Sequence, residues 1–405
     1  MRVGQHDRED ETVMEQKAKV HAAGGGGRVE GFGDRMTGFA GSRAHGLLSE
    51  LDELFAGFDG WLRGQYDAAS GGFYYAPSSR AMSGGPDIES TAQALNILER
   101  FGWLGGMPEE MKRGLVRFFE SKQDAASGYF YDAHPAMRED EVMVGRAISY
   151  SMNALRKLGG QPRYALPVAA KQAPAYMASP EAYAAWLRSV PLVNSWRGCD
   201  RLSTSSVFIG QVEDEGKKAA FAKTAFDFFA ETQDPETGLW GEGSYYVRIS
   251  GTFKLHIFYD RFGVPLPRED RIYRSILHAL REEEAADMCY IRNPIHLLSY
   301  MQVDIPPAEL EEIISITLAN MKRLLRADGG FSRELAHSPT APNVAQVKPG
   351  EVYPDMPQAV PIGGGLVEGD MNAGTQALLI RAVIYRLAGV AAPELLPGAD
   401  LARWA

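Results

Sequence analysis

The chain has 405 residues, of which 45% are hydrophobic and 23% charged, so it can bury a large core. Its formal net charge of -10 argues against nucleic acid as a partner and against general attraction to anionic membranes, although peripheral membrane contact stays open. The two cysteines, Cys199 and Cys289, lie far apart, so neither a disulfide framework nor a Cys-x-x-Cys metal site is expected. We therefore expect a cytoplasmic protein with no metal and no cofactor.

The chain begins with a polar, glycine-rich segment, residues 1–44, which we interpret as a flexible extension. No uninterrupted run of about 18 apolar residues occurs, so no transmembrane helix is predicted. Residues 45–390 carry a repeated pattern and are expected to form one domain. Residues 391–405 follow it as a C-terminal tail.

One short sequence motif, referred to as the repeated phrase, occurs four times within residues 45–390. A glutamine or arginine opens each copy, acidic or small residues follow, and a glycine with a nearby aromatic residue closes it. The copies occupy residues 65–73, 123–130, 233–240 and 326–331. Self-similarity at long spacing predicts a fold built from stacked copies of one supersecondary unit.

Two kinds of helix are predicted to alternate along the chain. Amphipathic helices are expected near residues 47–58, 108–122, 179–190, 215–232, 268–284 and 306–326. More apolar helices are expected near 87–101, 144–158, 199–211, 250–262, 287–301 and 369–387. Because alternating helices with short links pack as antiparallel neighbours, the pattern predicts an all-α fold, an α/α toroid of six helical hairpins. The apolar helices would form the inner ring around a central cavity for a small-molecule substrate.

Several stretches are similar to a known family. Residues 71–73, with Gly-Gly-Phe, residues 86–95 and residues 223–240 resemble the prenyltransferase and squalene-oxidase repeat, and the last resembles the QW motif of squalene-hopene cyclases. The resemblance to this terpenoid cyclase and protein prenyltransferase superfamily implies an α/α toroid. It also implies that the glutamines and aromatics of the phrases belong to the scaffold: Gln65, Gln123, Gln233, Phe73, Phe130, Trp240 and Phe331.

The segment Asp87-Ile88-Glu89-Ser90-Thr91-Ala92 resembles the Asp-x-Asp-Asp-Thr-Ala motif of type II terpene cyclases. That resemblance implies that Glu89 donates a proton to an alkene or epoxide, with Asp87 and Ser90 as its hydrogen-bonding companions. The implied function is acid-initiated cyclisation of a hydrophobic isoprenoid. The alternative is structural, because Asp and Glu at a helix start are also preferred as caps that interact with the helix dipole.

A second interpretation is a glycan-active enzyme, either a glycoside hydrolase or a polysaccharide lyase. Glu89 and Asp370 lie at the starts of the first and last inner helices, which are neighbours if the ring closes, so they could serve as a catalytic pair. A non-catalytic binding toroid is the third interpretation. Polar residues expected at the cavity are the candidates for substrate binding: Tyr131, His134, Arg146, Tyr245, His256, Arg292, His296 and Asn372.

One segment interrupts the repeat. Residues 331–368 form a long stretch rich in Pro and Gly that leads into the last predicted inner helix. Structureless loops longer than about 12–15 residues usually carry function or are disordered. We expect this loop to act as a lid over the cavity mouth.

Overall fold

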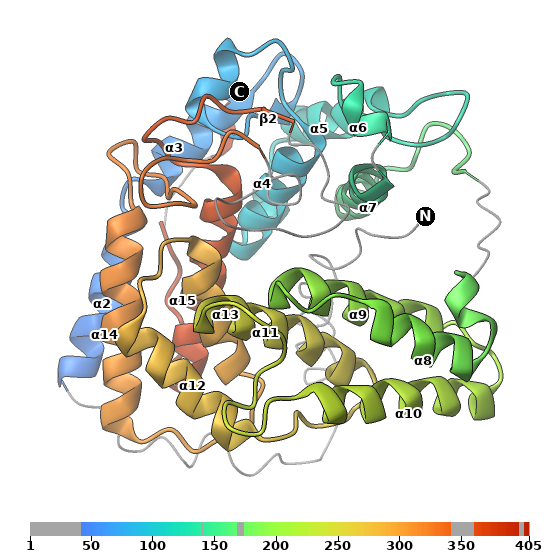
Figure 1. The fold of residues 1–405 in the computed structure, drawn as a ribbon. Helices are drawn as coiled ribbons and strands as arrows, with labels where there is room; N and C mark the ends of the chain where they lie inside the picture. The colour runs from blue at the N-terminus through green and yellow to red at the C-terminus, as the bar shows by residue number, and fades with distance from the viewer. Residues whose placement is uncertain (1–41, 140, 168–173, 342–359, 397–400, 405) are drawn as a thin grey trace, which may run out of the picture.

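The computed structural model describes residues 42–139, 141–167, 174–341, 360–396 and 401–404 (Figure 1). Within these ranges the protein is all-α, as predicted, and the strands are limited to a short antiparallel hairpin of β1 (Tyr66–Asp67) and β2 (Gly72–Phe73). Most of the predicted extension lies outside the described residues. Its last residues are helical, because the first helix begins at Ser42 and not after residue 44.

The helices form two alternating series. The first series contains α2 (Ser42–Glu53), α3 (Phe58–Gln65), α5 (Glu109–Ser121), α8 (Pro180–Ser189), α10 (Glu215–Thr232), α12 (Glu269–Glu282) and α14 (Pro307–Leu324). The second series contains α4 (Ile88–Arg100), α7 (Glu141–Lys157), α9 (Ser195–Ile209), α11 (Tyr245–Arg261), α13 (Met288–Leu298) and α15 (Met371–Leu387). Short elements join them, namely α6 (Ala136–Glu139) and the 3₁₀ turns Pro77–Ala81, Trp103–Gly106, Ala175–Ala178 and Leu401–Arg403.

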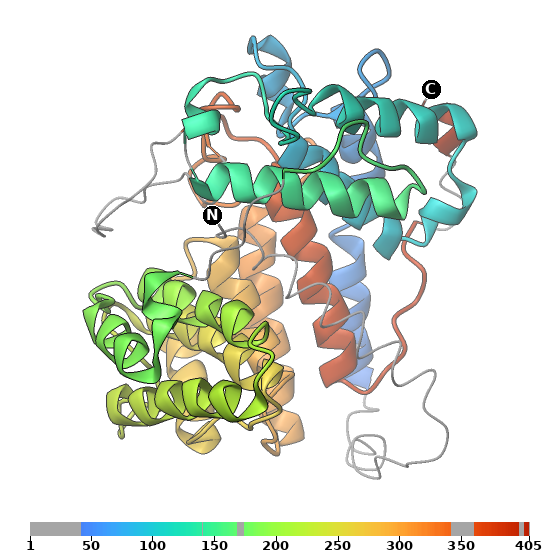
Figure 2. The ribbon, with the colours of Figure 1, turned by 90° about the vertical axis from the view of Figure 1, so that its right-hand side faces the viewer.

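Helices of the second series pack side by side (Figure 1, Figure 2). The helix α9 packs against α11, α11 against α13, and α13 against α15. The helix α15 then packs against α4, and α4 against α7, so the last helix of the series contacts the first. In the first series, α14 likewise contacts α2. Both views draw α7 and α9 apart, and the closed ring of the predicted toroid therefore stays a prediction.

Capping side chains decide where several helices begin. The helix α9 starts at Ser195, where the side chain of Asn194 accepts a hydrogen bond from the N–H of Arg197 at 3.1 Å. The helix α11 starts at Tyr245, because Ser244 caps it in the same way. Both begin earlier than the sequence pattern predicted. The pattern followed apolar residues, whereas a helix starts where its free N–H groups find acceptors.

The repeated phrases form a recurring turn. In the third copy, the Asp234 carboxylate accepts hydrogen bonds from two backbone N–H groups, one of them at Thr237, and Gly238 follows with φ of 71°. Gly71 and Gly128, at the matching positions of the first two copies, have φ of 78° and 73°. Glycine adopts this left-handed conformation without steric penalty, which explains its place in every copy.

The glutamine of the phrase ties the turn to its surroundings. The amide of Gln233 donates to the turn glycine's carbonyl and to the carbonyl of Pro267, at 2.8 and 2.9 Å. Gln123 does the same with its own turn and with Tyr164, both at 3.0 Å, whereas Gln65 donates within its own helix. The scaffold role is thus confirmed for the second and third copies. The aromatic residues of all four copies are fully buried: Phe73, Phe130, Trp240 and Phe331.

Both ends of the predicted lid segment are held by the core. Glu368 accepts a hydrogen bond from the N–H of Ser78 at 2.9 Å, and its own carbonyl accepts one from the Ser338 hydroxyl at 2.6 Å. Residues 342–359, the middle of the segment, lie outside the described residues, so the lid stays a prediction. In the C-terminal tail, Leu401 and Trp404 are buried in the core.

Candidate active site

Polar side chains form facing rows on the neighbouring helices α4 and α7. On α4 the row is Glu89, Gln93, Asn96 and Arg100, and on α7 it is Arg146, Tyr150, Asn153 and Lys157. The spacing of four, three and four residues keeps each row on one helix face. The rows are linked across the interface, because Arg146 pairs with Glu89 and Lys157 donates to Asn96 at 2.6 Å. The second series therefore carries a polar seam between these helices.

The Glu89–Arg146 pair is the most buried ion pair of this seam. The Arg146 Nη2 lies 2.6 Å from Glu89 Oε1 and its Nε lies 3.3 Å from Oε2, so the contact is bidentate. Both side chains are 9% exposed. Tyr150 accepts a further hydrogen bond from Arg146 at 3.1 Å, and Gln93 donates to Glu89 at 3.2 Å. A guanidinium in this position favours the ionised form of Glu89.

Asp87 caps α4, as the structural alternative for this motif predicted. One of its oxygens, Oδ1, accepts a hydrogen bond from the N–H of Ser90 at 2.8 Å. Burial raises the pKa of Asp87 to about 7, and the carboxylates of Asp132 and Glu89 act in the same direction. Asp132 itself pairs with Lys122 at 2.9 Å. Asp87 and Glu89, two residues apart, thus occupy opposite electrostatic environments.

Asp370 caps α15 with one carboxylate oxygen and holds the preceding loop with the other. Oδ1 accepts from the N–H of Ala373 at 2.9 Å, and Oδ2 accepts from the N–H of Arg333 at 2.7 Å and the Ser338 hydroxyl at 3.0 Å. Burial raises the pKa of Asp370 to about 6, against the effect of these hydrogen bonds and of the Arg333 charge. Because its oxygens are occupied by the scaffold, Asp370 fits the role of a cap better than that of a catalytic acid.

Tyr75 is a buried phenol on which the charges of all three carboxylates act. Its side chain is 2% exposed, and its hydroxyl is buried without a hydrogen-bond partner. Burial raises the pKa of Tyr75 well above its usual range, and the charges of Asp370, Glu89 and Asp87 act in the same direction. The predicted proximity of Glu89 and Asp370 is therefore consistent with the α4–α15 packing and with this shared phenol. Arg333 was missed because it lies just after the fourth phrase, in a segment that the sequence marks only as a loop.

A second polar cluster joins α11 and α13. The His256 ring lies against that of Tyr300 at 3.8 Å between centroids, and the guanidinium of Arg292 lies 5.1 Å from the centre of Phe253. Phe253 also contacts His296, at 6.0 Å between centroids. Aromatic faces beside a guanidinium suit a ligand that has both apolar and polar surfaces. Three predicted binding residues, His256, Arg292 and His296, are thus brought together.

His296 is held neutral in this cluster. Burial lowers its pKa well below the usual range, and the charges of Arg292, Arg386 and Arg100 act in the same direction. Its Nε2 atom is buried without a hydrogen-bond partner. A core histidine with satisfied hydrogen bonds would pair both ring nitrogens, whereas His296 leaves one of them unpaired.

The remaining predicted binding residues are dispersed. Tyr131 stacks under the Arg138 guanidinium at 4.7 Å, and His134 is exposed and accepts from a backbone N–H of the same loop at 3.2 Å. Tyr245 packs on His278 of the first-series helix α12, at 4.4 Å between ring centroids. Asn372 accepts from Gln376, one turn later in α15, at 2.6 Å. The contacts of Tyr131, His134 and Tyr245 named here do not involve Asp87, Glu89 or Asp370.

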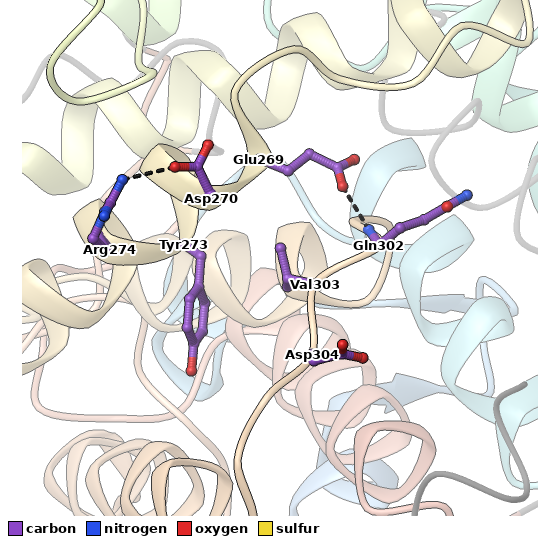
Figure 3. A pocket seen from close by; sticks show the side chains of 7 residues that line it. All are labelled: Glu269, Asp270, Tyr273, Arg274, Gln302, Val303 and Asp304. Atoms are coloured by element: carbon purple, nitrogen blue, oxygen red, sulfur yellow. Dashed lines mark hydrogen bonds and ion pairs between the residues drawn. The ribbon is translucent and has the colours of Figure 1, made fainter.

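An open pocket of ≈ 450 Å³ lies at the start of α12 and the loop between α13 and α14 (Figure 3). Its polar groups are used within the protein: the Glu269 carboxylate accepts from the N–H of Gln302 at 2.7 Å, and Arg274 pairs with Asp270 at 2.7 Å. None of the predicted site residues lines it. We therefore assign no role to this pocket.

The described part of the chain offers neither a metal site nor a membrane-spanning helix. No group of three or more His, Cys, Asp or Glu side chains there is arranged to hold a metal ion. No helix there has both the length and the apolar character needed to cross a bilayer.

In comparisons with known proteins, no family model matches the chain, and no curated protein matches it either. The resemblance to the terpenoid cyclase and protein prenyltransferase superfamily therefore stays a prediction. The assignment of function rests on the chemistry of the polar seam and of the α11–α13 cluster.

Proposed function

We propose that the protein is a glycan-active enzyme of the α/α-toroid type, with Asp87 as the general acid and Glu89 as the general base. The observation that supports it is the contrast between these two carboxyl groups. Asp87 has a pKa raised to about 7, whereas Glu89 is paired with Arg146. Neighbouring titratable groups in opposed environments are the usual mark of an acid and base pair.

In this proposal the reaction is hydrolysis of a glycosidic bond. Protonated Asp87 gives its proton to the leaving oxygen as the bond to the anomeric carbon breaks. Glu89 takes a proton from the attacking water, which forms the new bond to carbon. Arg146 positions Glu89, and the α11–α13 cluster binds the sugar through the faces of its aromatic rings. The substrate is a small molecule in a central cavity, and no nucleic acid is involved.

Acid-initiated cyclisation of an isoprenoid is less well supported. That reaction needs Glu89 as a neutral, strong acid, whereas the bidentate contact with Arg146 favours its carboxylate. The seam of paired polar side chains also differs from the dry, aromatic chamber that a cationic hydrocarbon requires. The closed toroid and the cytoplasmic location belong to the same proposal. The helix order is consistent with a ring, and two cysteines that form no disulfide are consistent with a reducing compartment.

The test compares two matched variants, Glu89→Gln and Glu99→Gln. Both glutamates lie on α4 and pair with a cation of α7, Arg146 or Lys157, but only Glu89 belongs to the proposed site. Release of reducing sugar from a panel of neutral and uronate oligosaccharides is measured for each. We expect Glu89→Gln to lose about 10²–10⁴-fold in kcat and Glu99→Gln to keep the wild-type rate.

A thermal-shift screen of the wild-type protein decides between the three interpretations. A ligand that binds the folded state raises its stability by RT ln(1 + [L]/Kd), about 2.7 kcal/mol at a hundredfold excess over Kd. Stabilisation by oligosaccharides supports the proposal. Stabilisation by isoprenoids alone would favour the cyclase instead. If neither oligosaccharides nor isoprenoids raise the melting temperature, a non-catalytic binding toroid is favoured.

A further inference from the structure

A half-buried cysteine stands in an unusual setting at the start of α13. Cys289 is the second residue of this helix, and Asp287 caps the helix by accepting from the N–H of Cys289 at 2.7 Å. The Nη2 atom of Arg333 donates to the Cys289 Sγ at 3.7 Å. A helix N-terminus and a guanidinium both favour the thiolate form of a cysteine.

The Arg333 side chain is held beside Cys289 by burial and by an ion pair with Asp287. Its side chain is 3% exposed, and its Nε lies 3.3 Å from Asp287 Oδ2. Its Nε and Nη1 atoms are buried without hydrogen-bond partners. Although burial acts in the opposite direction, the charges of Asp287, Cys289, Tyr75 and Asp370 raise the Arg333 pKa, so the guanidinium stays charged. A charged donor, Nη2, is thus held beside the sulfur.

Asp287 and Cys289 face different atoms of the Arg333 guanidinium. Asp287 Oδ2 lies beside Nε, whereas Nη2 faces the sulfur, so Cys289 keeps a charged donor of its own. Asp370 is hydrogen-bonded to the Arg333 backbone, and Tyr75 is a neutral phenol.

The other cysteine supplies an internal comparison. Cys199 is fully buried in α9, with its sulfur 3.8 Å from the Ser195 hydroxyl. Burial raises the pKa of Cys199 to about 12. A thiol in that setting stays protonated and out of reach of solvent at neutral pH.

We infer that Cys289 is a nucleophilic thiol and the chain's site of covalent modification by small, uncharged carbon electrophiles. In the step itself, the thiol gives its proton to solvent and the thiolate attacks carbon. With iodoacetamide the S–C bond forms as the C–I bond breaks, and iodide leaves. The inference does not depend on the proposed glycan activity.

The experiment measures alkylation of the full-length folded protein by iodoacetamide between pH 5 and pH 10, with the modified peptide identified by mass spectrometry. We expect Cys289 to react with a midpoint below about pH 7.5, and Cys199 to react only after unfolding. A midpoint at or above about 8.5, the value of an ordinary thiol, would overturn the inference, as would equal labelling of Cys199.

Variants separate the guanidinium from the helix. Asp287→Asn combined with Arg333→Gln removes the buried ion pair as a whole, so no unpaired charge is left to unfold the protein. We expect this double variant to label about tenfold more slowly than wild type at pH 7, because its thiolate fraction falls. An unchanged rate and midpoint in a folded double variant would show that Arg333 does not activate the thiol. Cys289→Ser, the labelling control, should take up no reagent while folded.

Discussion

The Glu89–Arg146 pair offers the sharpest test of the structure. Arg146→Gln removes the guanidinium and leaves Glu89, whose side chain is 9% exposed, without its bidentate partner. Breaking a buried ion pair by removing one partner costs about 3–5 kcal/mol, because the remaining charge is uncompensated. We expect the free energy of unfolding to fall by about that amount. The free energy of unfolding should fall less for Glu89→Gln, since the amide oxygen of Gln can still accept a hydrogen bond from Arg146.

The decisive measurement is a double-mutant cycle by urea unfolding at pH 7, followed by circular dichroism. In Glu89→Gln/Arg146→Gln the charges are removed together, so the double variant should regain much of the loss and show a coupling energy of about 2 kcal/mol. Lys157→Met with Glu99→Gln is the control, because that pair is more exposed, at 16% and 36%, and should couple by less than about 1 kcal/mol. A coupling near zero for the Glu89 pair would refute the buried contact.

Three further predictions concern stability. The free energy of unfolding of the wild type should fall as the pH rises from about 4 through about 7. The reason is that Asp87, with its raised pKa, binds its proton more tightly in the folded state than in the unfolded chain. In urea titrations, the free energy of unfolding of Asp87→Asn, which keeps a capping side chain, should depend less steeply on pH. Gly329→Ala should destabilise the protein by about 1–3 kcal/mol more than Gly263→Ala does. Both glycines have positive φ, but only at Gly329 would an added Cβ meet backbone, namely the Gly57 carbonyl oxygen at 2.4 Å. Equal thermal midpoints of the two variants would contradict this. Gln233→Ala should cost about 1–3 kcal/mol in the same assay, because the buried carbonyl of Gly238 and the half-buried carbonyl of Pro267 lose their donor. A neutral effect would remove this residue from the scaffold.

The order and type of the elements were predictable from the sequence alone. Apolar periodicity and the repeated phrase gave two alternating series of helices, because both signals are local and repeat at the spacing of the fold. The turn glycines and the scaffold glutamines followed from the same repeat. Cap chemistry was also local, and Asp87 and Asp370 lie where a helix N-terminus needs an acceptor.

Which side chains meet was decided only by the tertiary structure. Glu89 and Arg146 are 57 residues apart in sequence, and nothing local indicates that α4 and α7 align their polar rows. Arg333 and Cys289 come from a loop and a helix 44 residues apart, and their contact was not predicted. Burial, which raises the pKa of Asp87 and lowers that of His296, depends on every element packed around each group. Sequence periodicity shows which face of a helix is polar. The register between packed helices decides which charged groups pair and how their pKa values shift, because charges interact through space and not along the chain.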